Sequence, residues 1–227
     1  MIRAAIFANG EITNKEAVKS EVHDDDLIIA ADGGLRHIYG LGLKPNIVVG
    51  DLDSAPNELQ QLARTQGAEI IPHPARKDAT DLELALCLAR DRGASAAVVF
   101  GALGGRLDHA LANVLLLSST TVSGMAVHIV EAGYELFVTA GEVEIVGQPG
   151  DLVTLLALTE TAGEINTSGL EYPLVGGILY RGSSQGVSNV MVEDRAHVRV
   201  GDGCVLIIHL KAEQQEDKGP RRDDEAS

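Results

Sequence analysis

The sequence predicts an α/β domain, with a mostly parallel sheet and helices on both faces, followed by an all-β sandwich domain. Three observations carry this prediction. Short all-apolar runs alternate with helical patterns over residues 1–132, and strand-like segments separated by turns fill residues 133–211. The remaining residues, 212–227, are charged, mixed in sign and almost without apolar side chains, which is typical of a disordered tail. We therefore expect two folded domains and a tail.

The first domain contains short runs in which nearly every residue is apolar. Such a run predicts a strand buried on both faces, as in a parallel sheet covered by helices. The runs are IRAAIF, LIIAAD, NIVVGD, AEIIP, AAVVFG and MAVHIV. The best-defined helix follows Lys77, because Thr80 and Glu83 form a capping box and Gly93 stands where a C-terminal cap belongs.

The second domain shows no long helical pattern. Its strand-like segments are ELFVTA, EVEIVG, DLVTLLALT, GILYRG, NVMVED, AHVRV and CVLIIHL, with turn signals such as GQPGD and GSSQG between them. Short strands separated by turns predict a sandwich or barrel of antiparallel sheet. We expect a hairpin turn at Gly201-Asp202-Gly203, between the last two segments.

Composition limits the classes of function. Against 18 basic residues stand 33 acidic ones, and the formal net charge of −15 has the wrong sign for neutralising nucleic-acid phosphates. A polyanionic ligand such as a nucleotide would need a divalent cation. The two cysteines and seven scattered histidines indicate neither a disulfide framework nor a zinc site. Because no apolar run reaches the ~18 residues of a membrane span and the N-terminus lacks a signal-peptide pattern, we expect a cytoplasmic protein without a membrane partner.

Acidic residues follow four of the predicted strands. In an open parallel sheet, ligands bind at the carboxyl ends of the strands, so these residues are expected at one edge. Near a surface, two unit charges ~4 Å apart repel by several kcal/mol, so a cluster of carboxylates indicates a cation. Carboxylates are hard oxygen ligands of the kind that Mg²⁺ prefers. The acidic residues are Asp32, Asp51, Asp53, Asp78 and Asp81.

Each acidic residue also has a structural explanation. Asp32-Gly33-Gly34 is a common turn sequence, and Asp51 and Asp53 could solvate a loop. Asp78 and Asp81 would complement the positive end of the helix dipole. The same residue type at four consecutive strand ends favours the metal site over these separate explanations.

The segment GALGGRLDH, residues 101–109, is the second informative stretch. Gly104 and Gly105 would let backbone amides approach a phosphate, and Arg106 carries a permanently charged fork of donors. The segment matches neither the P-loop pattern nor the dinucleotide fingerprint, and a tight strand-to-helix connection would also select glycines. Together with the acidic edge, it indicates Mg²⁺ with a nucleotide and phosphoryl-type transfer outside the P-loop class.

The chain resembles the thiamine pyrophosphokinase family in a specific order of motifs. These are ADGG, GDLDS, KDATDLELAL, GALGGRLDHALAN and the later SSQGVSN, which together span nearly residues 7 to 192. The resemblance implies transfer of the pyrophosphoryl group of ATP to the hydroxyethyl oxygen of thiamine, with AMP released. It also implies Mg²⁺, an α/β nucleotide-binding domain before a thiamine-binding β sandwich, and a homodimer with active sites between subunits.

The resemblance also implies roles for particular residues. Those that it implies around the metal are Asp51, Asp53, Asp78 and Asp81. Those that it implies for ATP binding are Asp32, Gly33, Gly34, Lys77, Thr80, Gly104, Gly105, Arg106 and His109. The catalytic residues that it implies are Asp53, Asp78, Arg106 and Asp108, and the thiamine-binding residues are Ser188 and Asn189.

The group that accepts the proton of the thiamine hydroxyl stays open at this point. Asp108 is one candidate and His109 is another, although a histidine at a helix start could equally make a structural hydrogen bond. A loose transition state does not require full deprotonation of the alcohol, so positioning by the chain and Mg²⁺ is a third possibility.

One departure from the family concerns thiamine. Members of the family can stack an aromatic side chain, often tryptophan, on the thiamine rings, and this chain has no tryptophan. Tyr172, Tyr180 or neither would take that role. Two alternatives therefore stay open: a pyrophosphokinase with another hydroxymethyl acceptor, such as a pterin, and a non-catalytic nucleotide-binding module.

Overall fold

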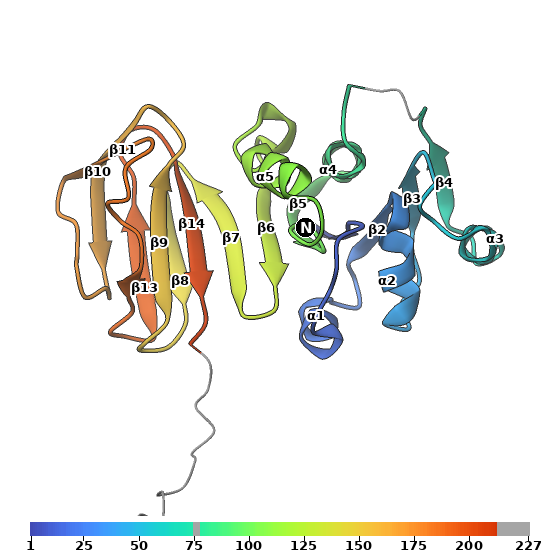
Figure 1. Ribbon diagram of the computed structural model, residues 1–227, viewed down its shortest axis with the longest axis horizontal. Coiled ribbons are helices and arrows are strands. Elements are labelled where there is room, and N and C mark those ends of the chain that lie inside the picture. Colours follow the sequence, from blue (N-terminus) through green and yellow to red (C-terminus); the bar gives the residue numbers. More distant parts are fainter. Residues whose placement is uncertain (75–77, 213–227) are drawn as a thin grey trace, which may run out of the picture.

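The computed structural model describes residues 1–74 and 78–212 (Figure 1). Two expectations fall outside that part of the chain. They are the ATP-binding role of Lys77 and the disorder of the tail, of which only Ala212 is described.

The N-terminal half is built on six parallel strands. In spatial order they are β6 (Ala126–Glu131), β5 (Ala94–Phe100), β1 (Ile2–Phe7), β2 (Leu27–Ala31), β3 (Ile47–Gly50) and β4 (Glu69–Pro72). The helices and helical turns between them are α1 (Lys15–Glu21), η1 (Asp32–Gly34), α2 (Leu35–Gly40), α3 (Asn57–Thr65), α4 (Asp81–Asp91), α5 (Leu107–Leu116) and η2 (Thr120–Val122). The predicted α/β domain is confirmed.

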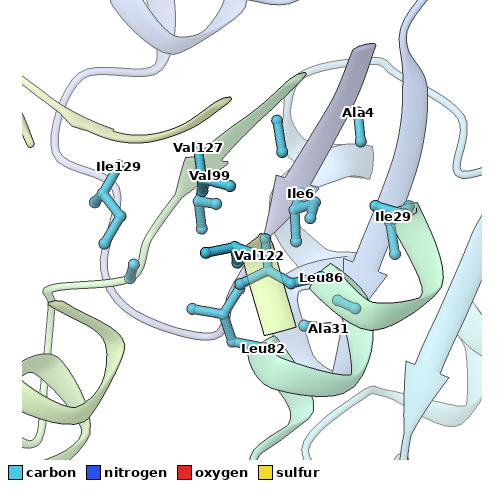
Figure 2. Packing of buried hydrophobic residues seen from close by; sticks show 14 of the residues in the cluster. Ala4, Ile6, Ile29, Ala31, Leu82, Leu86, Val99, Val122, Val127 and Ile129 are labelled. Atoms are coloured by element: carbon cyan, nitrogen blue, oxygen red, sulfur yellow. The ribbon is translucent and has the colours of Figure 1, made fainter. Parts of the chain in front are cut away.

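Helices cover both faces of this sheet because its strands are apolar on both sides. On one face, Leu82 and Leu86 of α4 pack with Ile6 and Val99 in a single cluster (Figure 2). The opposite face packs against α1, α2 and α3, for example through the fully buried Ile38. Burying a side chain of this kind stabilises the fold by roughly 1.5–3 kcal/mol.

Helix α4 begins and ends where its sequence signals predict. The hydroxyl of Thr80 accepts a hydrogen bond from the amide of Glu83 at 3.2 Å, which satisfies one of the free amides of the first turn. Gly93 follows the helix with a φ of +84°, a conformation that glycine adopts without strain. Because Thr80 and Asp81 begin the helix, the cap also fixes where Asp81 stands at the sheet edge.

The C-terminal half is a sandwich of two antiparallel layers. One layer comprises β12 (Asn189–Val190), β9 (Leu152–Ala157), β14 (Val205–Leu210) and β7 (Tyr134–Thr139). The other comprises β11 (Gly177–Tyr180), β10 (Thr161–Ser168), β13 (Arg195–Arg199) and β8 (Glu142–Val146). A cluster of buried residues, including Val153 and Ile207 from the first layer and Ile165 and Val198 from the second, fills the space between them.

The two halves share one continuous sheet of ten strands (Figure 1). Strand β7 pairs antiparallel with β6, with His128 opposite Phe137, so the predicted boundary at 132/133 falls inside a hairpin. The sequence did not predict this continuity. The hairpin expected at Gly201-Asp202-Gly203 is wrong, because β13 and β14 lie in different layers and the turn carries the chain from one layer to the other. No helix in the described residues is long and apolar enough to cross a membrane.

Candidate active site

A cleft of about 630 Å³ lies at the carboxyl ends of β1, β2, β3 and β5. This is the edge at which the sequence predicts ligand binding. The expected site residues that line it are Asp32, Asp51, Asp53, Thr80, Asp81, Gly104, Gly105, Arg106 and His109. The structure therefore brings together residues from four separate strand ends.

Three carboxylates meet in this cleft. Asp32, Asp51 and Asp53 each offer an oxygen, and these oxygens lie within 4.8 Å of one another. Asp32 is buried, with 6% of its surface exposed, and its Oδ1 has no hydrogen-bond partner among the described residues. A buried carboxylate oxygen without a partner is unfavourable unless a cation or water satisfies it. The donor set therefore fits a hard divalent cation such as Mg²⁺.

The electrostatics of Asp32 agree with that assignment. Burial raises the pKa of the Asp32 carboxyl, the negative charges of Asp81 and Asp51 act in the same direction, and hydrogen bonds from Ser54 and the Gly33 amide oppose them. Without a cation, the charged form of Asp32 is thus disfavoured in the fold. A bound cation would reverse that balance.

Gly50 permits the carboxylates to approach. Its φ is +142°, and a Cβ at this position would lie 2.8 Å from Oδ1 of Asp81 and 3.0 Å from Cβ of Asp32. Any side chain here would push Asp81 or Asp32 away from the cleft. The Gly-Asp order of GDLDS therefore has a steric reason.

Four other expected residues lie beside the cleft rather than in its wall. Gly33 and Gly34 form the turn η1, and a Cβ on Gly34 would collide with the carbonyl oxygen of Phe7, so this glycine allows η1 to pack on β1. Asp78 is exposed and is not part of the cleft wall in the described structure. The fourth is Asp108, whose carboxylate is held by a neighbouring arginine.

Arg106 and Asp108 form a bidentate ion pair. Nε of Arg106 lies 3.1 Å from Oδ1 of Asp108, and Nη2 lies 2.6 Å from Oδ2. The hydrogen bond from Arg106 lowers the pKa of Asp108 to about 2, and both side chains are largely exposed. In this state Asp108 is a weak base turned toward Arg106, whereas His109 lines the cleft.

The loop after β1 is a part of the site that sequence reasoning missed. Asn9 and Gly10 line the cleft, and the amide of Gly10 donates to the carbonyl of Gly101 at 2.8 Å. Two residues of α2 hold this loop: Arg36 donates to the carbonyl of Asn9 at 2.6 Å, and the His37 ring lies 2.7 Å from the carbonyl oxygen of Gly10. The Asn-Gly pair directly after an apolar run was the available signal.

Asn113 of α5 was also missed. Its side chain is buried, it lines the cleft, and Nδ2 donates to the carbonyl of Ala102 at 2.8 Å. This bond fixes the glycine-rich loop to the helix that follows it. A single amide side chain inside a helical pattern gives no sequence signal of this role.

The expected thiamine-binding residues lie in the β sandwich, outside the wall of the cleft. Ser188 has a φ of +58°, and its amide donates to the hydroxyl of Thr154 at 2.9 Å. The Asn189 side chain accepts from the amide of Tyr172 at 3.0 Å and donates to its carbonyl at 2.7 Å. Asn189 thus fixes the backbone of Tyr172, whose side chain is 67% exposed.

Fold and site together define a class of protein. In this class, a carboxylate-lined cleft lies at the carboxyl edge of a parallel α/β sheet, and the α/β domain is joined to an antiparallel β sandwich. The sequence model for the catalytic domain of thiamin pyrophosphokinase matches residues 18–129, and the model for its vitamin B1 binding domain matches residues 142–205. The chain belongs to the thiamine pyrophosphokinase family.

Individual relatives agree with this membership. The thiamine pyrophosphokinase of Bacillus subtilis is 26% identical over 184 residues, which cover 80% of this chain and 86% of the relative. Its crystal structure has a TM-score of 0.82 at 22% identity, covering 92% of this chain and 99% of that one. The thiamin pyrophosphokinase structure from Geobacillus thermodenitrificans has a TM-score of 0.80 at 25% identity and covers 94% and 99%.

Proposed function

We propose that this protein transfers the pyrophosphoryl group of ATP to the hydroxyethyl oxygen of thiamine, giving thiamine diphosphate and AMP. The observation that carries the proposal is the carboxylate cluster, with its unpartnered Asp32 oxygen, beside the glycine and arginine loop in one cleft. Family membership supports the choice of donor and acceptor.

Mg²⁺ is the cofactor in this proposal. Asp32, Asp51 and Asp53 would hold it, with Asp81 beside them. When bound, Mg²⁺ neutralises part of the triphosphate charge and stabilises the charge that develops during transfer. This assignment moves Asp32 into the ligand set and moves Asp78 out of it, because Asp78 is exposed outside the cleft wall.

In the transfer, a bond forms between the hydroxyethyl oxygen and the β-phosphorus. The bond from that phosphorus to the oxygen bridging the α-phosphate breaks, and AMP leaves with the bridging oxygen. Arg106 and the amides of Gly104 and Gly105 would bind the phosphate oxygens and hold the group in line. His109 lines the cleft and would receive the hydroxyl proton, whereas Asp108 lies outside the cleft wall.

A homodimer is the second part of the proposal. The wall of the cleft, as far as the structure describes it, comes from the α/β half, whereas the expected thiamine-binding residues lie in the sandwich. A second copy would bring its sandwich to the cleft. In support, α5 exposes an apolar stripe next to Arg106 and His109: Leu107, Leu111 and Leu115 are 72%, 56% and 60% exposed and recur every four residues.

An acceptor panel tests the proposed reaction. AMP release from ATP and Mg²⁺ would be measured with thiamine, with a hydroxymethyl pterin and with no acceptor. We expect AMP release that depends on thiamine. Release that depends only on the pterin would assign another pyrophosphokinase, and ATP binding without any AMP would leave a nucleotide-binding module.

A further inference from the structure

The glycine-rich loop, residues 101–106, is held from both sides. It leaves β5, which lies between β1 and β6 in the sheet. On the β1 side, the amide of Gly10 binds the carbonyl of Gly101 at 2.8 Å. On the β6 side stands Glu131, the last residue of that strand, which neither composition nor motif singles out.

Glu131 binds the backbone of the loop. The amide of Leu103 donates to its Oε1 at 3.3 Å, and the amide of Ala102 also acts on this carboxylate. The carbonyl of Ala102 is bound at 2.8 Å by Nδ2 of Asn113. The loop is therefore bound at the Leu103 amide from β6 and at the Ala102 carbonyl from α5.

The loop packs against the core at Ala102 and Leu103, and it borders a second cavity at Leu103 and Gly104. This cavity, of about 150 Å³, lies on its other side, lined by Glu131, Glu11, Leu103 and Tyr134 among others, and Gly104 borders both cavities. At Gly104 the loop thus separates the two cavities. Beside the packing of Ala102 and Leu103, the hydrogen bonds to Glu131 and Asn113 therefore fix the backbone that leads into Gly104.

The charge of Glu131 works against a triphosphate in the main cleft. A carboxylate close to a phosphate site repels the ligand, and here it also takes the Leu103 amide as a hydrogen-bond donor. Burial raises the pKa of Glu131, and the amides of Leu103 and Ala102 oppose that shift. The benefit of Glu131 must therefore come from its hydrogen bonds to the loop.

We propose that Glu131 is a positioning residue for the polyphosphate: by holding the amide of Leu103, it presents the amides of Gly104 and Gly105 and the side chain of Arg106 to the main cleft. The inference rests on the proposed ATP substrate. The glycine-rich loop follows β5, and Glu131 would support it from the neighbouring strand β6.

Three variants test the proposal: Glu131→Ala, Glu131→Gln and, as the matched control, Glu11→Ala. Glu11 lines the same small cavity and carries the same charge, and its side chain makes no hydrogen bond to the loop among the described residues. Two properties would be measured. They are amide hydrogen exchange of residues 101–106 in the nucleotide-free protein, and the KM for ATP together with kcat.

In Glu131→Ala we expect faster exchange in the loop and a KM for ATP raised about tenfold, with a smaller change in kcat. Glu131→Gln keeps an acceptor oxygen and loses the charge, so its KM should stay within about twofold of the parent value. Glu11→Ala should match the parent protein in both measurements. A difference in KM and loop exchange between Glu131→Ala and Glu131→Gln distinguishes a role of the hydrogen bond from a role of the charge.

Unchanged loop exchange in Glu131→Ala would overturn the proposal, as would faster exchange with an unchanged KM. So would a Glu131→Gln variant as impaired as Glu131→Ala. If the parent protein releases no AMP, the proposed function fails separately. The Kd for ATP, measured by titration calorimetry on the same variants, then decides the role of Glu131 by the same comparison.

Discussion

Asp32 carries a buried carboxylate whose Oδ1 no described residue satisfies. Its pKa is raised by burial, so the charged form destabilises the metal-free fold. Without Mg²⁺, we expect Asp32→Asn to have a higher Tm than the parent protein. The Tm should rise by about 2–4 °C for each 1 kcal/mol by which the variant avoids the cost of burying the charged carboxylate. The same variant should lose the Tm gain that Mg²⁺ gives the parent protein. Thermal unfolding with and without Mg²⁺ measures both, with the exposed Asp24→Asn as control; a lower Tm in metal-free Asp32→Asn would contradict the assignment.

Asp53 and Asp78 are both exposed aspartates, and they differ in their position relative to the cleft. Asp53 lines the cleft with Asp32 and Asp51, whereas Asp78 lies outside its wall. We expect Asp53→Ala to lower kcat/KM by on the order of 100-fold or more, since the proposed Mg²⁺ would lose a ligand. Asp78→Ala should cost less than about tenfold. Steady-state kinetics, with circular dichroism to confirm folding, decides; equal losses would restore the metal role that the resemblance gives Asp78.

At the scale of single residues, the sequence predicts the charged residues and glycines of the site better than its amide residues. Asp51 and Asp53 follow an apolar run closely, and Arg106 stands in the loop after another, so strand direction alone places them at one edge. Asn9 and Asn113 were missed because an amide side chain gains its role only when the fold brings it to the cleft. The pairing of Asp108 with Arg106 likewise depends on rotamers that no motif encodes.

A chain of ionisable groups, buried at one end, links β14 with β7, β6 and the residue before β9. His209 of β14 is fully buried, with Nε2 2.8 Å from Oδ2 of Asp151 and Nδ1 3.4 Å from Oε1 of Glu135. Asp151 also accepts the amide of Ala212 at 2.8 Å, which fixes the chain where β14 ends. Glu135 extends the chain of contacts to His128 of β6 at 3.3 Å.

This cluster predicts a pH window of stability. The hydrogen bond with Glu135 raises the pKa of His209 above 6.5, so its contribution is full below about pH 6.5 and is lost as pH rises through the folded pKa. Hydrogen bonds from His128 and His209 lower the pKa of Glu135 to about 2, so its contribution is lost as pH falls from 4.5 toward that value. We expect His209→Gln to lower the free energy of unfolding at pH 6 and to flatten its decline above pH 7. Urea unfolding at a series of pH values measures this free energy. The same dependence on pH in the parent protein and in His209→Gln would refute the prediction.

The positions of strands and helices could be predicted from the sequence better than the pairing between strands. Each apolar run of the α/β half became a strand, and the Thr80 cap began α4, because these signals are local. The ten-stranded continuity and the crossing between layers at Gly201–Gly203 were not predicted, because they depend on pairings between distant segments. Strand alternation reports which face is buried, and it does not report which neighbour a strand takes.

At the scale of the whole molecule, each site of the proposed homodimer joins residues of two copies. Asp53→Ala damages the cleft, and Tyr172→Ala removes an exposed aromatic ring beside Asn189 that could stack on thiamine. If each site joins the cleft of one copy to the sandwich of the other, mixed dimers contain one intact site. Co-refolding two inactive variants should therefore restore roughly a quarter of the parent activity, since half of the dimers are mixed and half of their sites are intact. Mixed dimers that are seen by native mass spectrometry and recover no activity would exclude sites shared between copies.

The most direct test of the central claim is the product analysis of one reaction. The purified protein would be incubated with ATP, Mg²⁺ and thiamine, and the products would be separated by chromatography with mass detection. We expect AMP and thiamine diphosphate to appear in equal amounts, and neither product when Mg²⁺ is chelated. ADP with thiamine monophosphate, or bound ATP without AMP, would contradict the proposed reaction.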